Sequence, residues 1–100
     1  MNSVILKGNT NVFTCCSDIQ KTLFWKHQPV GSRSIGDIND LRGLVDGYRT
    51  SGRFNVTPDI SGGCYSLVIK DVTSADVGMY LCLDDAGLGQ MKGWELIVLG

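Results

Sequence analysis

The 100-residue sequence lacks the features of membrane-spanning, zinc-binding and nucleic-acid-binding proteins. No apolar run approaches the roughly 20 residues of a membrane helix, and no secretory signal with a charged start and an apolar centre is present. Nine basic residues are scattered among ten acidic ones, so no basic stripe for nucleic acid forms. One histidine and no paired C-x-x-C motif argue against a zinc site.

What the sequence does have is four cysteines in a short chain, which favours disulfide bonds. Disulfides persist in oxidising surroundings, so we expect an extracellular protein, either secreted or the ectodomain of a membrane protein. Such a protein needs a leader, and any membrane anchor would lie beyond Gly100. The length fits one domain over residues 1–100.

Short apolar runs separated by turn residues predict an all-β sandwich. Residues 32–52 have a weaker pattern, and we expect one or two short edge strands and long loops there. Residues 71–77 predict a single helical turn, because Thr73 and Ser74 can cap one. The predicted strands cover residues 4–6, 11–17, 23–28, 53–56, 64–70, 79–83 and 94–99.

The most specific pattern is D-x-G-x-Y-x-C over residues 76–82. Its companions upstream are Cys15 or Cys16, Trp25, Arg53 and Phe54. Together these residues resemble an immunoglobulin variable-type (V-set) domain, similar to leukocyte-receptor or antigen-receptor-like domains, over nearly the whole chain. The resemblance implies a two-sheet antiparallel Greek-key sandwich. It also implies that Tyr80 bonds nearby backbone through its hydroxyl.

The resemblance further implies a disulfide from the first cysteine pair to Cys82, between the sheets. Neighbours on a strand point oppositely, so only one of Cys15 and Cys16 faces the core. We favour Cys15, which gives the longer and more usual interval to Trp25. In the register of the family, Cys16 then lies opposite Cys64, which implies a second bridge, Cys16–Cys64. The alternative is that these two thiols are unpaired or bond another chain.

Two further structural roles follow from the resemblance. Trp25 is expected to pack on the Cys15–Cys82 bridge, as the buried tryptophan of the family does. Arg53 and Asp76 match the pair that forms a salt bridge across the base of V-set domains. The alternative is two independent solvated charges.

No catalytic site can be assembled from the sequence, and we expect neither an enzyme nor a cofactor. His27 is the only histidine and sits mid-strand, where a structural role is expected. Asp84 and Asp85 could hold a metal or act in acid–base chemistry, but no other acidic group converges on them, so a solvated loop is the better interpretation. The glycines of residues 87–89 precede a strand, unlike those of a phosphate loop.

One sheet face is the predicted binding surface. If Trp25, Tyr80 and Cys82 face inward, the alternate residues form an outward apolar patch with a polar rim. The patch is Phe24, Met79, Leu81, Leu83 and Ile97, and the rim is Lys26, Gln28 and Glu95. Soluble monomers seldom leave such a patch bare, so we expect a protein partner. Because variable domains pair through this face, the specific partner that we expect is a second copy of the chain, giving a homodimer. The alternative is that residues 32–45 fold over the patch.

The sequence therefore predicts an extracellular recognition or adhesion domain of an immune-type receptor, with no contact to membrane or nucleic acid. The alternatives are a structural module in a longer extracellular chain, or a carbohydrate or small-ligand module using loops 30–48 and 84–92. The polar contacts of that ligand module would come from Asp37, Asp40, Asp46, Asp84 and Asp85, and its aromatic contact from Tyr48. Asn55 begins a glycosylation sequon, which its strand position and the following Pro58 weaken.

Overall fold

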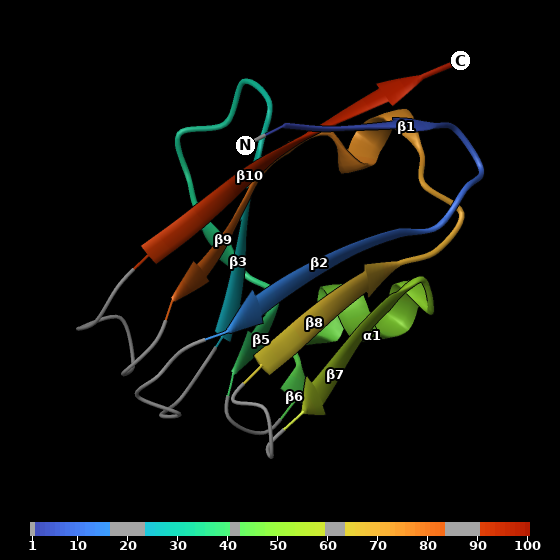
Figure 1. Cartoon of the computed structure of the whole chain (residues 1–100). Coiled ribbons are helices and arrows are strands. Elements are labelled where there is room, and N and C mark those ends of the chain that lie inside the picture. Colours follow the sequence, from blue (N-terminus) through green and yellow to red (C-terminus); the bar gives the residue numbers. More distant parts are fainter. Residues whose placement is uncertain (1, 17–23, 41–42, 60–63, 84–90) are drawn as a thin grey trace.

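The computed structural model of the chain describes residues 2–16, 24–40, 43–59, 64–83 and 91–100. Within these ranges two main sheets enclose a hydrophobic core, which confirms the predicted all-β sandwich (Figure 1). The strands are β1 (Asn2–Leu6), β2 (Asn11–Cys16), β3 (Phe24–Pro29), β4 (Gly36–Asp37), β5 (Asn39–Asp40), β6 (Gly43–Leu44), β7 (Phe54–Asp59), β8 (Cys64–Ile69), β9 (Gly78–Leu83) and β10 (Met91–Leu99). The helix α1 spans Asp46–Ser51, and a 3-10 turn spans Ser74–Asp76.

The larger sheet has the strand order β1-β10-β9-β3-β4, and the second has the order β2-β8-β7. A separate two-stranded ladder joins β5 to β6. All described pairs are antiparallel except β1 with β10, which is parallel. The chain passes from β1 to β2 through Gly8, whose φ of 91° suits glycine. Gly8 donates its N–H to the carbonyl of Val72 at 2.8 Å, which fixes this crossing between the sheets.

The core forms because alternate residues of each strand point between the sheets. In β2 the burial pattern alternates strictly, with Asn11, Phe13 and Cys15 inward. An aromatic cluster fills the centre, where the ring of Trp25 lies 5.3 Å from that of Trp94 and 6.2 Å from that of Phe13. Burying each large apolar side chain contributes about 1.5–3 kcal/mol, so this cluster carries much of the driving force for folding.

Residues 32–52 contain more structure than the sequence predicted. The strands β4, β5 and β6 are two residues each, and the helix α1 was not predicted at all. Every side chain of α1 is exposed or half-buried, so no apolar periodicity marks it in the sequence. It ends at Gly52, whose φ of 69° gives the left-handed cap common at helix ends. No helix in the described ranges is long and apolar enough to cross a membrane.

The helical turn predicted within residues 71–77 is present as the 3-10 turn at Ser74–Asp76. Thr73 begins it, and its hydroxyl accepts a hydrogen bond from the backbone N–H of Ala75 at 3.3 Å. In return the carboxylate of Asp76 accepts the N–H of Thr73 at 2.8 Å. This reciprocal capping positions Asp76 directly before β9.

Candidate protein-binding face

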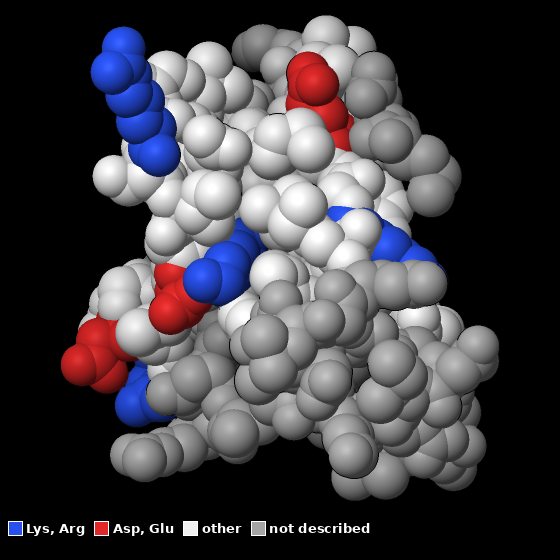
Figure 2. Space-filling view, turned by 90° about the vertical axis from the view of Figure 1, so that its left-hand side faces the viewer, with Lys and Arg blue, Asp and Glu red and all other residues white. Residues whose placement is uncertain are grey.

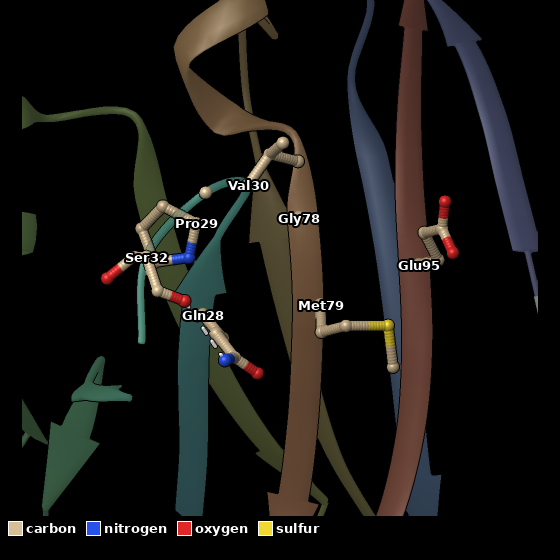
Figure 3. Close-up of a pocket in the computed structure, with 8 residues that line it drawn as sticks. Gln28, Pro29, Val30, Ser32, Gly78, Met79 and Glu95 are labelled. Atoms are coloured by element: carbon tan, nitrogen blue, oxygen red, sulfur yellow. Dashed lines mark hydrogen bonds between the residues drawn. The ribbon is translucent and has the colours of Figure 1, made fainter. Parts of the chain in front are cut away.

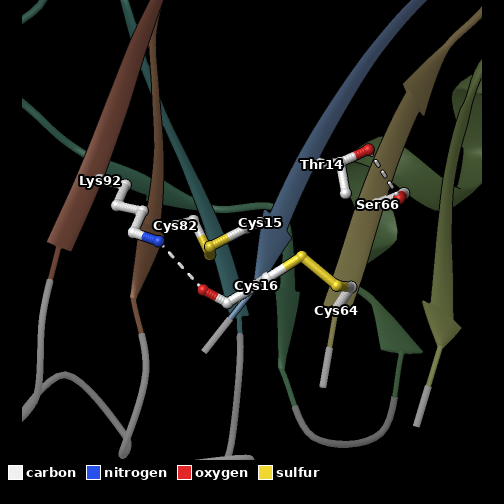
Figure 4. Close-up of a disulfide and its surroundings, with 7 residues drawn as sticks. All are labelled: Thr14, Cys15, Cys16, Cys64, Ser66, Cys82 and Lys92. Carbon is white, nitrogen blue, oxygen red and sulfur yellow. Dashed lines mark hydrogen bonds between the residues drawn. A yellow bond between two sulfur atoms is a disulfide. The ribbon is translucent and has the colours of Figure 1, made fainter. Parts of the chain in front are cut away.

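Two disulfides cross-link the sandwich, one between the two sheets and the other within the β2-β8-β7 sheet (Figure 4). Cys15 bonds Cys82 between the two sheets, with Cα atoms 6.4 Å apart, and both residues are buried. Cys16 bonds Cys64 on the neighbouring strand of the same sheet, with Cα atoms 3.9 Å apart. Both bridges join the pairs that the resemblance implied. Lys92 on β10 donates from Nζ to the carbonyl of Cys16 at 3.0 Å, a further contact between the sheets.

Asp76 is the centre of a bonded cluster at one end of the sandwich. Arg53 donates from both terminal nitrogens to its two carboxylate oxygens, at 2.6 and 3.0 Å. Burial on its own would raise the pKa of Asp76, but the hydrogen bonds from Arg53 and from the backbone of Thr73 outweigh it and hold that pKa below its usual value. The hydroxyl of Tyr80 donates to the backbone carbonyl of Asp76 at 2.6 Å. The expected ion pair and tyrosine contact are therefore present.

The two buried rings of β3 face the core, as expected. Trp25 is fully buried and lies directly opposite Cys82 on β9. The ring of His27 stacks on that of Tyr80, with centroids 4.2 Å apart and planes within 6°. Its Nε2 lies 3.4 Å from the carbonyl oxygen of Val77. Burial lowers the pKa of His27, and the contact with Val77 only partly offsets this, so the imidazole is neutral near pH 7.

Tyr48 belongs to the same core and not to an open loop. Its hydroxyl lies 3.3 Å from Nδ1 of His27, and its ring meets that of Phe54 edge-on with centroids 4.9 Å apart. Tyr48 therefore packs between α1 and the core. The expectation that it is a loop aromatic available to a carbohydrate is wrong, because a neighbouring strand supplies a ring for it to pack on.

The outward residues of the larger sheet line up in rows across the strands β3, β9 and β10. Directly opposed residues are close neighbours, so each row acts as a unit. The rows are Gln28, Met79 and Glu95, then Lys26, Leu81 and Gly93, then Phe24, Leu83 and Met91. The structure thus brings the predicted patch and rim onto one face, together with Ile97 farther along β10.

The middle of this face is more closely packed than the sequence indicated. Leu81 points outward but is only 8% exposed, so its expected exposure is wrong. The reason is Gly93, which leaves a space that the ends of the Leu81 and Met79 side chains fill. A Cβ at Gly93 would lie 3.1 Å from Leu81 and 3.2 Å from Met79. The other predicted patch residues are half-buried, namely Phe24, Met79, Leu83 and Ile97.

Strand β1 extends the apolar surface beyond the predicted patch. Its parallel pairing sets Val4 beside Ile97 and Leu6 beside Leu99 on the same outer face. Val4 and Leu6 are each 58% exposed, more than any residue of the predicted patch. Sequence reasoning missed them because an isolated apolar run does not reveal which strand it joins. Figure 2 shows this side of the molecule, where uncharged atoms fill the middle of the upper half and charged side chains lie around them.

One ion pair lies at the far margin of the face. Nζ of Lys26 is 3.0 Å from a carboxylate oxygen of Asp37, and 5.4 Å from the ring centre of Phe24. Asp37 belongs to β4, which extends the sheet at its edge, and the next residue, Ile38, is fully buried. Of residues 32–45, which the alternative expectation placed over the patch, residues 36–38 therefore do not fold over it, while the carbonyl of Ser32 contacts the rim residue Gln28.

The aspartates of the alternative ligand site do not form a cluster in the part of the chain that is described. Asp37 pairs with Lys26 on the sheet, and Asp46 lies in the first turn of α1, 3.6 Å from Arg49. The predicted loop residues 84–90 lie outside the described residues, as does the side chain of Asp40. Among the described residues no three His, Cys, Asp or Glu side chains are placed to hold a metal ion.

No protein-family model and no curated protein matches this chain. Among solved structures, the first Ig domain of the mouse polymeric immunoglobulin receptor is similar, with a TM-score of 0.73 and 20% sequence identity. The match covers 99% of this chain and 91% of that chain. At this identity the likeness bears on the fold alone. Together with the two sheets, the bridge between them and the Tyr80 contact, it shows that the chain has the immunoglobulin variable-type fold.

Proposed function

We propose that the chain is an extracellular recognition domain of an immune-type receptor, cell-surface or secreted, that binds a protein through the outer face of the β1-β10-β9-β3-β4 sheet. The observation that carries the proposal is the apolar surface of that face, which continues from the half-buried patch onto exposed Val4 and Leu6. Monomeric proteins seldom expose contiguous apolar surface without a partner. The two disulfides support an oxidising, extracellular setting.

A carbohydrate partner is less well supported. Glycan sites combine exposed aromatic rings with polar groups, and Tyr48 is packed against Phe54. The immunoglobulin fold also typically serves recognition and not catalysis, and recognition sites are defined by their surface chemistry. Asn55 is exposed on β7, outside the proposed face, so a glycan attached there would leave the face open.

The test uses two matched substitutions on opposite sides of the sandwich. Val4 is 58% exposed on the proposed face, and Val12 is 54% exposed on the outer face of the other sheet. Fluorescent tetramers of the chain are applied to leukocytes with and without protease treatment. We expect protease treatment and Val4→Arg to abolish staining, and Val12→Arg to leave it intact. Staining that survives protease but not glycosidase, or that both variants lose equally, contradicts the proposal.

A more specific form of this proposal is that the partner is a second copy of the chain, which forms a homodimer through the same face. Sedimentation equilibrium is expected to give a mass that rises with concentration for the wild type and for Val12→Arg, and a monomer mass for Val4→Arg. A wild type that stays monomeric at millimolar concentration refutes the homodimer but leaves a different protein partner to the tetramer experiment.

A further inference from the structure

A shallow pocket lies at one end of the proposed face, where β3 ends and the chain turns through residues 30–32 (Figure 3). It has a volume of about 290 Å³. Its floor includes Gly78, whose φ of 137° and close approach to β3 exclude a side chain. Met79 lies over the middle, and the row of Gln28, Met79 and Glu95 crosses the pocket from β3 to β10.

The polar atoms on the two sides of Met79 are acceptors. Gln28 donates from Nε2 to the carbonyl of Ser32 at 3.1 Å, which fixes the orientation of its amide. The amide oxygen therefore turns toward Met79, as Figure 3 shows. On the other side, Glu95 is exposed and supplies a carboxylate. The backbones of β3 and β10 are two strand spacings apart, roughly 10 Å, so a side chain that lies along Met79 can pair with one of these two acceptors.

Glu95 is the one charged residue among those that line the pocket. Lys26 lies one row away and is engaged by Asp37 at 3.0 Å. Within the described ranges Glu95 forms no ion pair. A partner group that enters the pocket must therefore bring hydrogen-bond donors and a positive charge to match the two acceptors.

We propose that this pocket receives an arginine side chain of the protein that the face binds, an inference that rests on the proposed function. The aliphatic stem of the arginine lies along Met79, whose flexible thioether adapts to it. The planar guanidinium presents five donors in a fixed fork, which suits a paired contact with the two oxygens of the Glu95 carboxylate. A carboxylate or phosphate in the same place would carry the same sign of charge as Glu95 and would be repelled by it.

The methionines provide a direct readout. The chain has three, and two lie on the proposed face: Met79 in the pocket and Met91 in a row farther along β10. With 13C-labelled methionine methyl groups, the chain is titrated with Nα-acetyl-arginine methylamide and, in parallel, with the citrulline analogue, which has the same shape without the charge. The Met79 methyl resonance is expected to shift saturably with the arginine probe, while that of Met91 stays in place.

Removing the charge on either side should weaken binding. Citrulline in place of arginine, or Glu95→Gln in place of the wild type, is expected to raise the dissociation constant roughly tenfold, as the loss of one charge-assisted hydrogen bond does. Because Glu95 is exposed, Glu95→Gln should keep the wild-type thermal stability. A Met79 resonance that does not shift, or that shifts equally with both probes or in Glu95→Gln, overturns the pocket.

The two proposals fail separately. If the Met79 resonance is unmoved while Val4→Arg still abolishes cell staining and Val12→Arg does not, the arginine pocket is wrong and the binding face stands. If the pocket binds the probe as expected but neither valine variant changes staining, the pocket is a real site and the wider face is not the contact surface.

Discussion

Asp76 makes three contacts at the residue scale, and a single substitution tests the two that its side chain makes. Its carboxylate pairs with Arg53 and caps the turn through Thr73, while its backbone carbonyl accepts the hydroxyl of Tyr80. Asp76→Ala removes the first two and leaves Arg53 without its partner. We expect a loss of about 2–4 kcal/mol in the free energy of unfolding, measured by urea denaturation, because breaking a largely buried pair is costly and a cap adds to it.

A matched control for this substitution is Asp46→Ala. Asp46 also pairs with an arginine, Arg49, but its side chain is 96% exposed. Exposed ion pairs contribute little, so this variant should unfold at nearly the wild-type urea concentration. Equal losses for the two variants would mean that the Asp76 cluster has no special role in stability.

The burial of His27 predicts that the stability of the domain depends on pH. Burial holds its pKa below the ordinary 6.5, so the unfolded chain takes up a proton at a higher pH than the folded chain does. Stability is therefore full above pH 6.5 and falls as the pH drops from there toward the folded pKa of His27. The groups around the ring are Tyr48, Tyr80 and Asp76. The Asp76 contribution has a different window, because its pKa lies below 3.8 and its stability is lost only as the pH falls through that value.

Urea denaturation at a series of pH values measures the histidine effect. The wild type is expected to lose stability as the pH falls below 6.5, whereas His27→Phe, which retains a ring beside Tyr80, should show a flatter profile below that pH. Parallel profiles for the two proteins would show that another group is responsible.

At the scale of the strands, β9 depends on the glycine at its start. A Cβ on Gly78 would lie 2.3 Å from the carbonyl oxygen of Gln28, and the φ of 137° is one that other residues rarely adopt. Gly78→Ala should therefore separate β9 from β3 and cost about 2 kcal/mol or more. The control is Gly47→Ala in α1, where nothing lies within 4 Å. It should be neutral or stabilise by up to about 1 kcal/mol, because alanine favours helices. Equal thermal midpoints for the two variants would contradict this account.

The elements that could be predicted are those whose own residues form a recognisable sequence pattern. Tyr80 and Cys82 belong to the D-x-G-x-Y-x-C pattern, so β9 could be predicted with its inward residues, although Leu81 between them is buried as well. The helix α1 could not, because its six residues bury no side chain completely and only Tyr48 packs against the core. The parallel pairing of β1 was also hidden, since the residues near Val4 show an apolar run but not its neighbour.

At the scale of the molecule, the sequence predicted which way side chains point better than how deeply they are buried. Strand parity placed Met79 and Leu81 on the same face, and the structure agrees. The burial of Leu81 depends on the missing side chain of Gly93, which lies on a different strand. How deeply a side chain is buried depends on the sizes of the residues opposite it on adjacent strands. The sequence of one strand alone therefore does not predict it.

The whole fold is closed by two bridges that differ in accessibility, and this predicts the order of their reduction. Cys15 and Cys82 are 4% and 1% exposed, whereas Cys16 is exposed and Cys64 half-buried. A phosphine reductant added to the native protein should therefore open Cys16–Cys64 first, with the sandwich still folded by circular dichroism. Alkylation and mass spectrometry identify the freed thiols. Reduction of Cys15–Cys82 should follow only with unfolding, since this bridge spans 67 residues and contributes roughly 4 kcal/mol by closing that loop. Simultaneous loss of both bridges at low reductant would show that the outer bridge is required for the fold.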